Sequence, residues 1–119
     1  MSISILRTSQ EFTPEEKYRY TKDASVEKLS DHVGESITVV GFIRFQESSI
    51  DKNGEQVTHE VLSLILDDGS AIGTNSKTVQ KTFDNMADIF GDDLLPRDLV
   101  IFSEKSPSTG RPYMNIRLA

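Results

Sequence analysis

The stretch at residues 113–118 alternates polar and apolar side chains. Its polar positions are Tyr113, Asn115 and Arg117. Because successive side chains of a β-strand point to opposite faces, we expect these three to share an outer face while the apolar positions between them enter the core. A ring can stack on a nucleobase and a guanidinium can pair with a phosphate. This face therefore has the chemistry of a nucleic-acid contact.

A second stretch of this kind is Thr38–Gln46, which reads TVVGFIRFQ. As a regular strand it places Phe42 and Arg44 together on an outer face. A bulge at Gly41 would exchange the faces of every residue after it. Other roles also stay open: Phe42 could pack under the N-terminal segment or in a subunit interface, and Arg44 could pair with Glu60 across the strands.

The composition favours one acidic domain with a basic segment. The chain has 119 residues, a net charge of −6 and no cysteine, which excludes disulfides and thiolate catalysis. The charge opposes nucleic-acid binding by the molecule as a whole. Residues 99–119, however, hold three basic residues against one acid, and salt confines a field to about 8–10 Å. The sequence contains no pattern of a signal peptide or a membrane span, so we expect a soluble, cytoplasmic protein.

The predicted elements are five strands with one helix between the third and the fourth. The strands are expected at residues 36–48, 56–66, 71–74, 99–105 and 113–118. The helix, Lys77–Phe90, carries one apolar stripe that would plug the end of a barrel. This order, with a long first strand bent at Gly41, predicts a mainly β protein with the five-stranded Greek-key barrel called the OB-fold. Another small α+β sheet with the helix on one face is the alternative.

The chain is expected to be a single OB-fold domain over residues 1–119. Residues 36–119 would form the barrel, and residues 1–35 would be an N-terminal extension with short helical turns. The run Thr13-Pro14-Glu15-Glu16 is a helix-start signal, because the threonine can cap a helix whose third residue reaches back to it.

Residues 25–119 resemble the single-stranded DNA-binding proteins of the OB-fold type. More narrowly, they are similar to those of phages that infect lactococci and related Gram-positive bacteria. The resemblance rests on the segments LSDHVGESITVVGFIRF, LSLILDDGSAIGTNS and LVIFSEK and on their order. It implies binding of single-stranded DNA with little sequence preference, which would protect and organise the strand during DNA replication and recombination.

The candidate nucleic-acid contacts lie on two strands and two loops. They are Phe42, Arg44, Lys52, Lys105, Arg111, Tyr113, Asn115 and Arg117. Lys52 falls on the loop between the first two predicted strands, and Lys105 and Arg111 fall on or beside the loop between the last two. These loops flank the usual ligand face of an OB-fold. Rings with cations between them are the groups that single-strand binders use.

No residue pattern indicates catalysis. His32 and His59 lack the spacing of metal ligands, and the acidic pairs at 67–68 and 92–93 are typical of turns and helix ends. We therefore expect a protein that is not an enzyme and that needs no cofactor and no metal.

Two classes of function remain. The first is the single-stranded DNA binder, with replication or recombination proteins as further candidate partners. The second is an OB-fold protein-interaction module in a replication or structural assembly, in which the exposed rings form an assembly interface. A protein that coats long strands gains from linked sites, so we expect a dimer or higher homo-oligomer, joined through Ser2–Tyr20 or an exposed strand edge.

Overall fold

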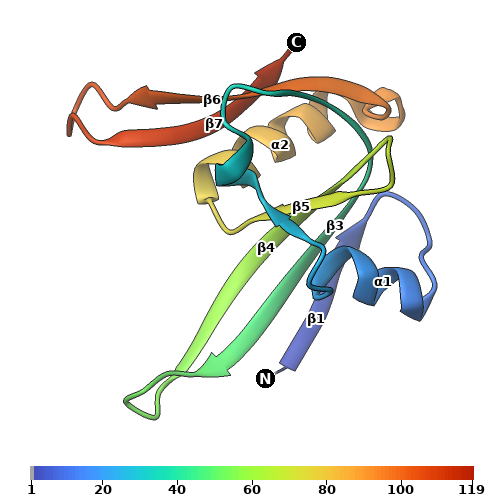
Figure 1. Ribbon diagram of the computed structural model, residues 1–119, viewed down its shortest axis with the longest axis vertical. Coiled ribbons are helices and arrows are strands. Elements are labelled where there is room, and N and C mark those ends of the chain that lie inside the picture. Colours follow the sequence, from blue (N-terminus) through green and yellow to red (C-terminus); the bar gives the residue numbers. More distant parts are fainter. Residues whose placement is uncertain (1) are drawn as a thin grey trace.

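The computed structural model describes residues 2–119 and shows a mainly β protein with two α-helices (Figure 1). The strands are β1 Ser2–Thr8, β2 Glu27–Lys28, β3 Ser36–Ile50, β4 Gln56–Leu66, β5 Ala71–Thr74, β6 Arg97–Lys105 and β7 Pro112–Leu118. The helices are α1 Pro14–Thr21 and α2 Lys77–Phe90, with short 3-10 helices at Leu29–His32 and Gly91–Asp93. Neither α-helix of the described chain has the length and apolar character to cross a membrane.

The predicted helix start at Thr13 and the predicted bounds of the second helix are confirmed. Ser76 caps α2 by accepting a hydrogen bond from the Val79 N–H at 3.3 Å, and the helix has the bounds predicted from its apolar stripe. At α1 the Thr13 side chain accepts from the Glu16 N–H at 3.2 Å, while the Glu16 carboxylate accepts from the Thr13 N–H at 3.0 Å. This reciprocal pair fixes the helix start.

The five predicted strands correspond to β3–β7, but the prediction of five is wrong in number. The segment expected to form only short helical turns supplies two more strands, β1 and β2. β1 pairs with β3, and β2 makes the sheet's one parallel pair, with β5. Both strands depend on partners distant in sequence, and local helix signals do not reveal such partners.

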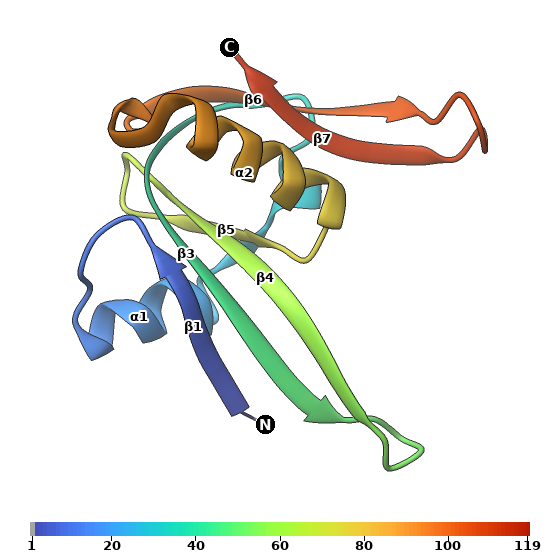
Figure 2. The ribbon, with the colours of Figure 1, turned by 180° about the vertical axis from the view of Figure 1, so that it is seen from behind.

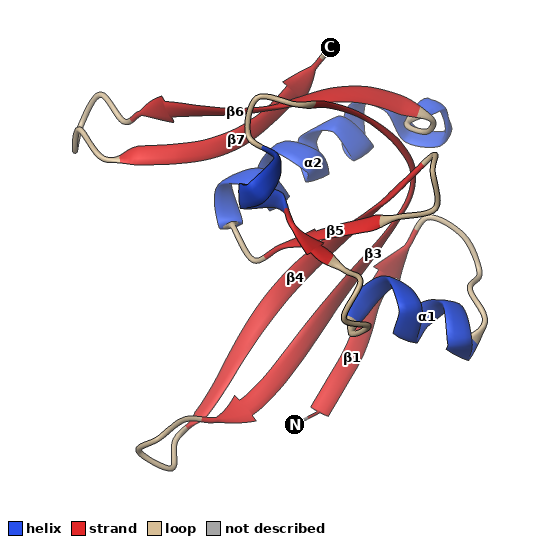
Figure 3. Cartoon of the chain, viewed as in Figure 1, coloured by secondary structure: helices blue, strands red, loops and turns tan. Residues whose placement is uncertain are grey.

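All seven strands form one curled, open sheet. The order is β2-β5-β4-β3-β6-β7, with β1 added to β3. β3 pairs with β4 along one edge; on its other edge it pairs first with β6 through Ser36–Val39 and then with β1. Within residues 2–119 β5 and β7 do not pair, so the sheet curls around α2 without closing (Figures 2 and 3).

A β-bulge lies in β3 where the strand bends. Val39 pairs with Leu66 and Gly41 pairs with Ile65, so Val40 is an extra residue. A Cβ atom on Gly41 would lie 3.2 Å from the Ser9 Oγ, a tight contact that glycine avoids. The expected bend at this glycine is therefore present, and it takes the form of a bulge, which exchanges the two faces of the strand after it.

The sheet buries apolar side chains on both faces. Inside the curl, the Phe42 and Phe83 rings meet edge to face with centroids 5.1 Å apart, within the cluster that also holds the apolar stripe of α2. On the opposite face, α1 and the segment before it cover Ile43, Phe45 and Ile65. Because both faces of β3 are covered over this length, the strand does not offer an open apolar surface there.

His32 is held between two carboxylates at the end of a 3-10 helix. Its Nδ1 lies 3.1 Å from the Glu35 carboxylate, and its Nε2 lies 3.3 Å from Glu27. The hydrogen bond and charge of Glu35, with help from Glu27, outweigh the effect of burial and raise the pKa of His32 above its ordinary value. The imidazole therefore links β2 to the turn that precedes β3, and its protonated form makes the stronger link.

We expect this site to make stability depend on pH. A raised folded-state pKa contributes stability that is fully present below the unfolded value of 6.5 and is lost as pH rises through the folded pKa. In urea unfolding at a series of pH values, His32→Gln should remove this component, worth up to about 1 kcal/mol. The control is His59→Gln, because His59 makes none of the ion pairs found in residues 2–119. An unchanged pH dependence in His32→Gln would contradict the assignment.

Candidate nucleic-acid interface

The β6–β7 hairpin extends from the body as an arm (Figures 1 and 2). Opposite residues in its two strands are Val100 and Arg117, Phe102 and Asn115, and Glu104 and Tyr113. These three pairs share the outer face of the arm, while Leu99, Ile101 and Ile116 on the other face are buried. The structure thus places Tyr113, Asn115 and Arg117 on one outward face, as their alternation predicts.

The outer face of the arm combines rings with polar groups. The Arg117 guanidinium carbon lies 5.1 Å from the centroid of the Phe102 ring, so the cation lies against an aromatic face. The Tyr113 hydroxyl lies 3.4 Å from the Glu104 carboxylate. The Asn115 side chain accepts from the Ile116 N–H at 2.8 Å. Arg117 is exposed and makes no ion pair within the described residues.

Phe102 was missed by the sequence analysis. It is half-buried. Phe102 pairs with Asn115, and Tyr113 lies two residues before Asn115 on the same face, so the two rings are diagonal neighbours across the hairpin. The signal was present in the sequence: Val100, Phe102 and Glu104 alternate with the buried Leu99 and Ile101. In an antiparallel pair such diagonal side chains lie within reach of one another. The arm therefore presents two neighbouring rings.

Two further predicted contacts lie at the end of this arm. Lys105 ends β6 opposite Pro112, and Arg111 lies in the connecting loop; both are exposed. The loop is closed by a hydrogen bond from the Ser106 N–H to the Arg111 carbonyl at 2.8 Å. Arg111 lies in the loop at the tip of the arm, whereas Lys105 follows the alternation of Ile101 and Ser103 and belongs to the opposite face of the hairpin.

Lys52 lies apart from the other contacts. It is exposed in the turn between β3 and β4, where the Asp51 carboxylate accepts from the Asn53 and Glu55 N–H groups at 2.8 and 3.0 Å. This turn is the tip of a second arm, at the opposite end of the molecule's long axis from β6 and β7 (Figure 1). The structure does not bring Lys52 together with the β6–β7 face.

Arg44 is engaged inside the protein. Its guanidinium forms ion pairs with Asp84 on α2 and, at 3.2 Å, with Glu60 on β4, and it donates to the Gln80 side chain at 3.1 Å. Burial opposes the charge, but the two carboxylates outweigh it and raise the pKa of Arg44. The alternative pairing with Glu60 is confirmed, and the cation is already neutralised, which speaks against a phosphate contact.

Gln80 completes this polar link. Its side chain is only 3% exposed. The amide nitrogen donates to the Glu60 carbonyl at 2.9 Å and to the Thr74 carbonyl at 3.3 Å, while the amide oxygen accepts from Arg44. A buried amide must find such partners. The network therefore fixes α2 against the sheet.

The expectation that Phe42 faces outward is wrong. Its side chain is 5% exposed and packs on Phe83 in the core. The cause is the bulge at Val40, which turns Phe42 to the same side as Val39. A ring in this position is not available as a stacking platform for a base.

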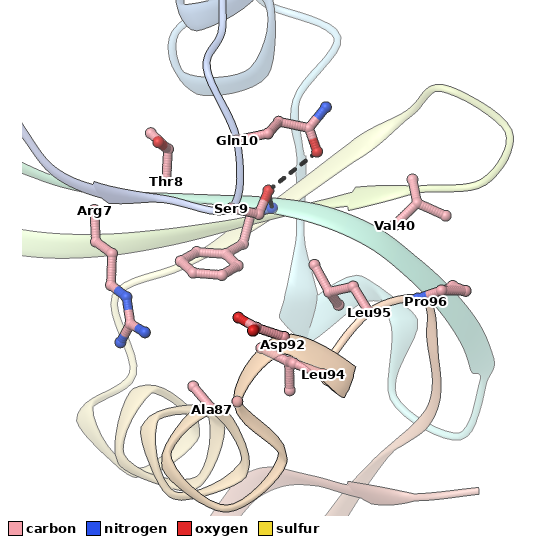
Figure 4. A pocket seen from close by; sticks show the side chains of 12 residues that line it. Arg7, Thr8, Ser9, Gln10, Val40, Ala87, Asp92, Leu94, Leu95 and Pro96 are labelled. Atoms are coloured by element: carbon pink, nitrogen blue, oxygen red, sulfur yellow. Dashed lines mark hydrogen bonds between the residues drawn. The ribbon is translucent and has the colours of Figure 1, made fainter.

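Phe42 lines one hollow of about 560 Å³ where the end of β1 meets the end of α2 (Figure 4). Val40, Leu95 and Pro96 contribute apolar wall, and Arg7 and Asp92 bring opposite charges to the same hollow. The Arg7 guanidinium carbon lies 5.8 Å from the Phe42 ring centroid. This concave site was not predicted, and it shares only Phe42 with the predicted contacts.

The acidic turns do not gather into a metal centre. Asp68 accepts from the N–H and the hydroxyl of Ser70 at 2.9 and 2.6 Å, which is ordinary turn chemistry. Across residues 2–119 no group of three or more histidine, aspartate or glutamate side chains is arranged to hold a metal ion.

No protein-family model, curated protein or solved structure matches the chain.

The different positions of Phe42 and Tyr113 predict different effects of losing the ring. Phe42→Ala should lower the free energy of unfolding by about 3–5 kcal/mol, because it leaves a cavity under α2. Tyr113→Ala should lower it by less than about 1 kcal/mol, since the ring lies outside both core clusters. Urea unfolding followed by circular dichroism measures both. Equal losses in the two variants would contradict the placement of Phe42.

Proposed function

We propose that the protein binds single-stranded DNA with little sequence preference through the outer face of the β6–β7 arm. The observation that carries this proposal is the grouping of Phe102 and Tyr113 on one face with Arg117, which makes no ion pair within residues 2–119. Stacking on a ring contributes about 1–3 kcal/mol per base and tolerates any base, because each base has a π-face. In this proposal the protein protects and organises the strand during DNA replication and recombination.

We further propose that β3–β7 are an open variant of the OB-fold. Three features support this assignment: β3 pairs with both β4 and β6, β4 also pairs with β5, and β6 with β7. α2 lies between the third and fourth of these strands in the sequence, where the OB-fold has its helix. The loop between the last two strands is one of the ligand-binding loops of that fold, and here it continues the β6–β7 face.

Local charge supports the same face in an acidic protein. Arg117, Arg111 and Lys105 lie on this arm, where the only acid from residue 99 onward is Glu104. The carboxylates of α2 lie on a different element, and salt limits their reach to about 8–10 Å. A strand on the outer face would meet Arg117 there and Arg111 in the loop at the tip, beside one carboxylate, Glu104.

The basic test compares one oligonucleotide in three forms. Fluorescence anisotropy with a mixed-sequence single strand, its duplex and the matching RNA should show tighter binding of the single strand than of the duplex. Rings can stack only on bases that are free of a helix. No binding of the single strand at low salt would contradict the proposal and would favour the protein-interaction module.

Removal of either ring should weaken binding at every salt concentration. Tyr113→Ala and Phe102→Ala should each cost about 1–3 kcal/mol, since a stacking surface is lost without any change in charge. The matched control is Tyr18→Ala, because Tyr18 is an exposed tyrosine on α1, which lies far from the arm (Figure 1). Equal affinities of the Tyr113 and Tyr18 variants would exclude Tyr113 as a stacking platform.

Removal of the cation should instead change the salt dependence. Arg117→Ala should reduce the slope of log affinity against log salt by about 0.7, the value for one phosphate contact on a single strand. Arg19→Ala on α1 makes the same change in net charge at a distant, exposed position. If both variants change the slope equally, the effect comes from overall charge and not from a contact at Arg117.

A further inference from the structure

Another hollow, of about 500 Å³, lies where the first turns of α2 face β3 and β4 (Figure 2). Every residue that lines it is polar or charged, and none belongs to β6 or β7. We call it the polar hollow. Its volume falls within the range of small-ligand sites. Because its wall offers no apolar surface, it favours a small, charged ligand over an apolar one.

The polar hollow is locally positive in an acidic protein. Arg44 lies in its wall with both of its carboxylate partners, Glu60 and Asp84, and this group of three carries one negative charge in excess. Lys77 and Lys81 also line the hollow and make no ion pair within residues 2–119. Three cations against two carboxylates leave one positive charge, whereas the chain as a whole carries −6.

The two lysines share one face of α2, because they are four residues apart. Like charges at this spacing repel each other and destabilise a helix. Both side chains are exposed at the mouth of the hollow, and the carboxylates that could have offset them are engaged by Arg44. An anion bound between Lys77 and Lys81 would relieve this repulsion.

We propose that the polar hollow binds a ligand with two or more neighbouring phosphate groups. Lys77 and Lys81 each neutralise one phosphate, since a lysine ammonium acts as a compact point charge with three donors. Gln46 on β3 and Asn75 before α2 line the same hollow, and their amide groups can donate hydrogen bonds to phosphate oxygens. Two phosphates suit the site better than one, because two separate lysine charges have no carboxylate partner.

Neighbouring phosphates occur in a free triphosphate and along a nucleic-acid strand. The chemistry that the hollow recognises is the same in both, so the experiments below separate the two sources. The proposal does not depend on single-strand binding by the β6–β7 arm, because no residue of that arm lines the hollow.

Inorganic triphosphate is the probe for a free ligand. At low salt, calorimetry should detect its binding, and the backbone amide NMR signals of residues 75–81 should shift most. Lys77→Gln and Lys81→Gln should each weaken this binding about 3- to 10-fold, the range for one charge-assisted contact at a partly open site. The control is Lys17→Gln, which removes the same charge from α1 on the opposite face of the sheet.

A mixed-sequence single strand is the probe for the second source. If triphosphate does not bind, Lys77→Gln and Lys81→Gln should each reduce the slope of log affinity against log salt for the strand by about 0.7, and Lys17→Gln should not. Circular dichroism checks that each variant is folded. The proposal is overturned if the lysine variants change the binding of neither probe, if Lys17→Gln changes it equally, or if triphosphate shifts the signals of the β6–β7 arm instead.

Discussion

One extra residue in β3, Val40, determines how the rest of the molecule is arranged around its central strand. Before the bulge, β3 pairs with β6; after it, the same edge pairs with β1. The bulge turns Phe42 under α2. It also leaves Gly41 without a side chain where Ser9 approaches, so that the Ser9 hydroxyl accepts from the Phe42 N–H at 2.9 Å. Residues 39–42 of β3 thus bend the sheet, supply the ring on which α2 packs, and bind the N-terminal segment through Ser9.

The parts of the fold that local chemistry specifies could be predicted from the sequence. α2 has a serine cap and an apolar stripe at helical spacing, and the β6–β7 hairpin alternates without interruption, so its outer face was assigned correctly. β3 is different, because apolar residues lie on both of its faces and alternation alone cannot locate the extra residue. β1 was missed for another reason: its partner begins more than 30 residues later, and no local signal marks that pairing.

The two arginines of the predicted site show why residue type does not decide a role. In the sequence, Arg44 and Arg117 each fall on the same face of a predicted strand as an aromatic residue, Phe42 for the first and Tyr113 for the second. Asp84 and Glu60 reach Arg44 from α2 and β4 and neutralise it, whereas Arg117 lies on Phe102 and is open to solvent. The carboxylates that neutralise Arg44 are distant from it in the sequence and are brought to it by the fold, so this arginine links elements of the structure. The other remains available to an anion.

The open side of the sheet has a mechanical consequence for the β6–β7 arm. Only Ser36–Val39 joins β6 to β3, and β7 has no strand on its far edge within residues 2–119. Beyond Val100, the backbone of β6 is also bonded to the body at Ile101, whose N–H donates to the Glu35 carbonyl at 3.0 Å and whose carbonyl accepts from the Gly34 N–H at 2.7 Å. Past Ile101, no backbone hydrogen bond between the arm and the body is found within residues 2–119. Segments with few such bonds open at low free-energy cost. A closed barrel would bond the far edge of β7 to another strand. Here that edge is unpaired within residues 2–119, so we expect the outer part of the arm to open at a lower free-energy cost than its base, which is anchored in the core through Leu99, Ile101 and Ile116.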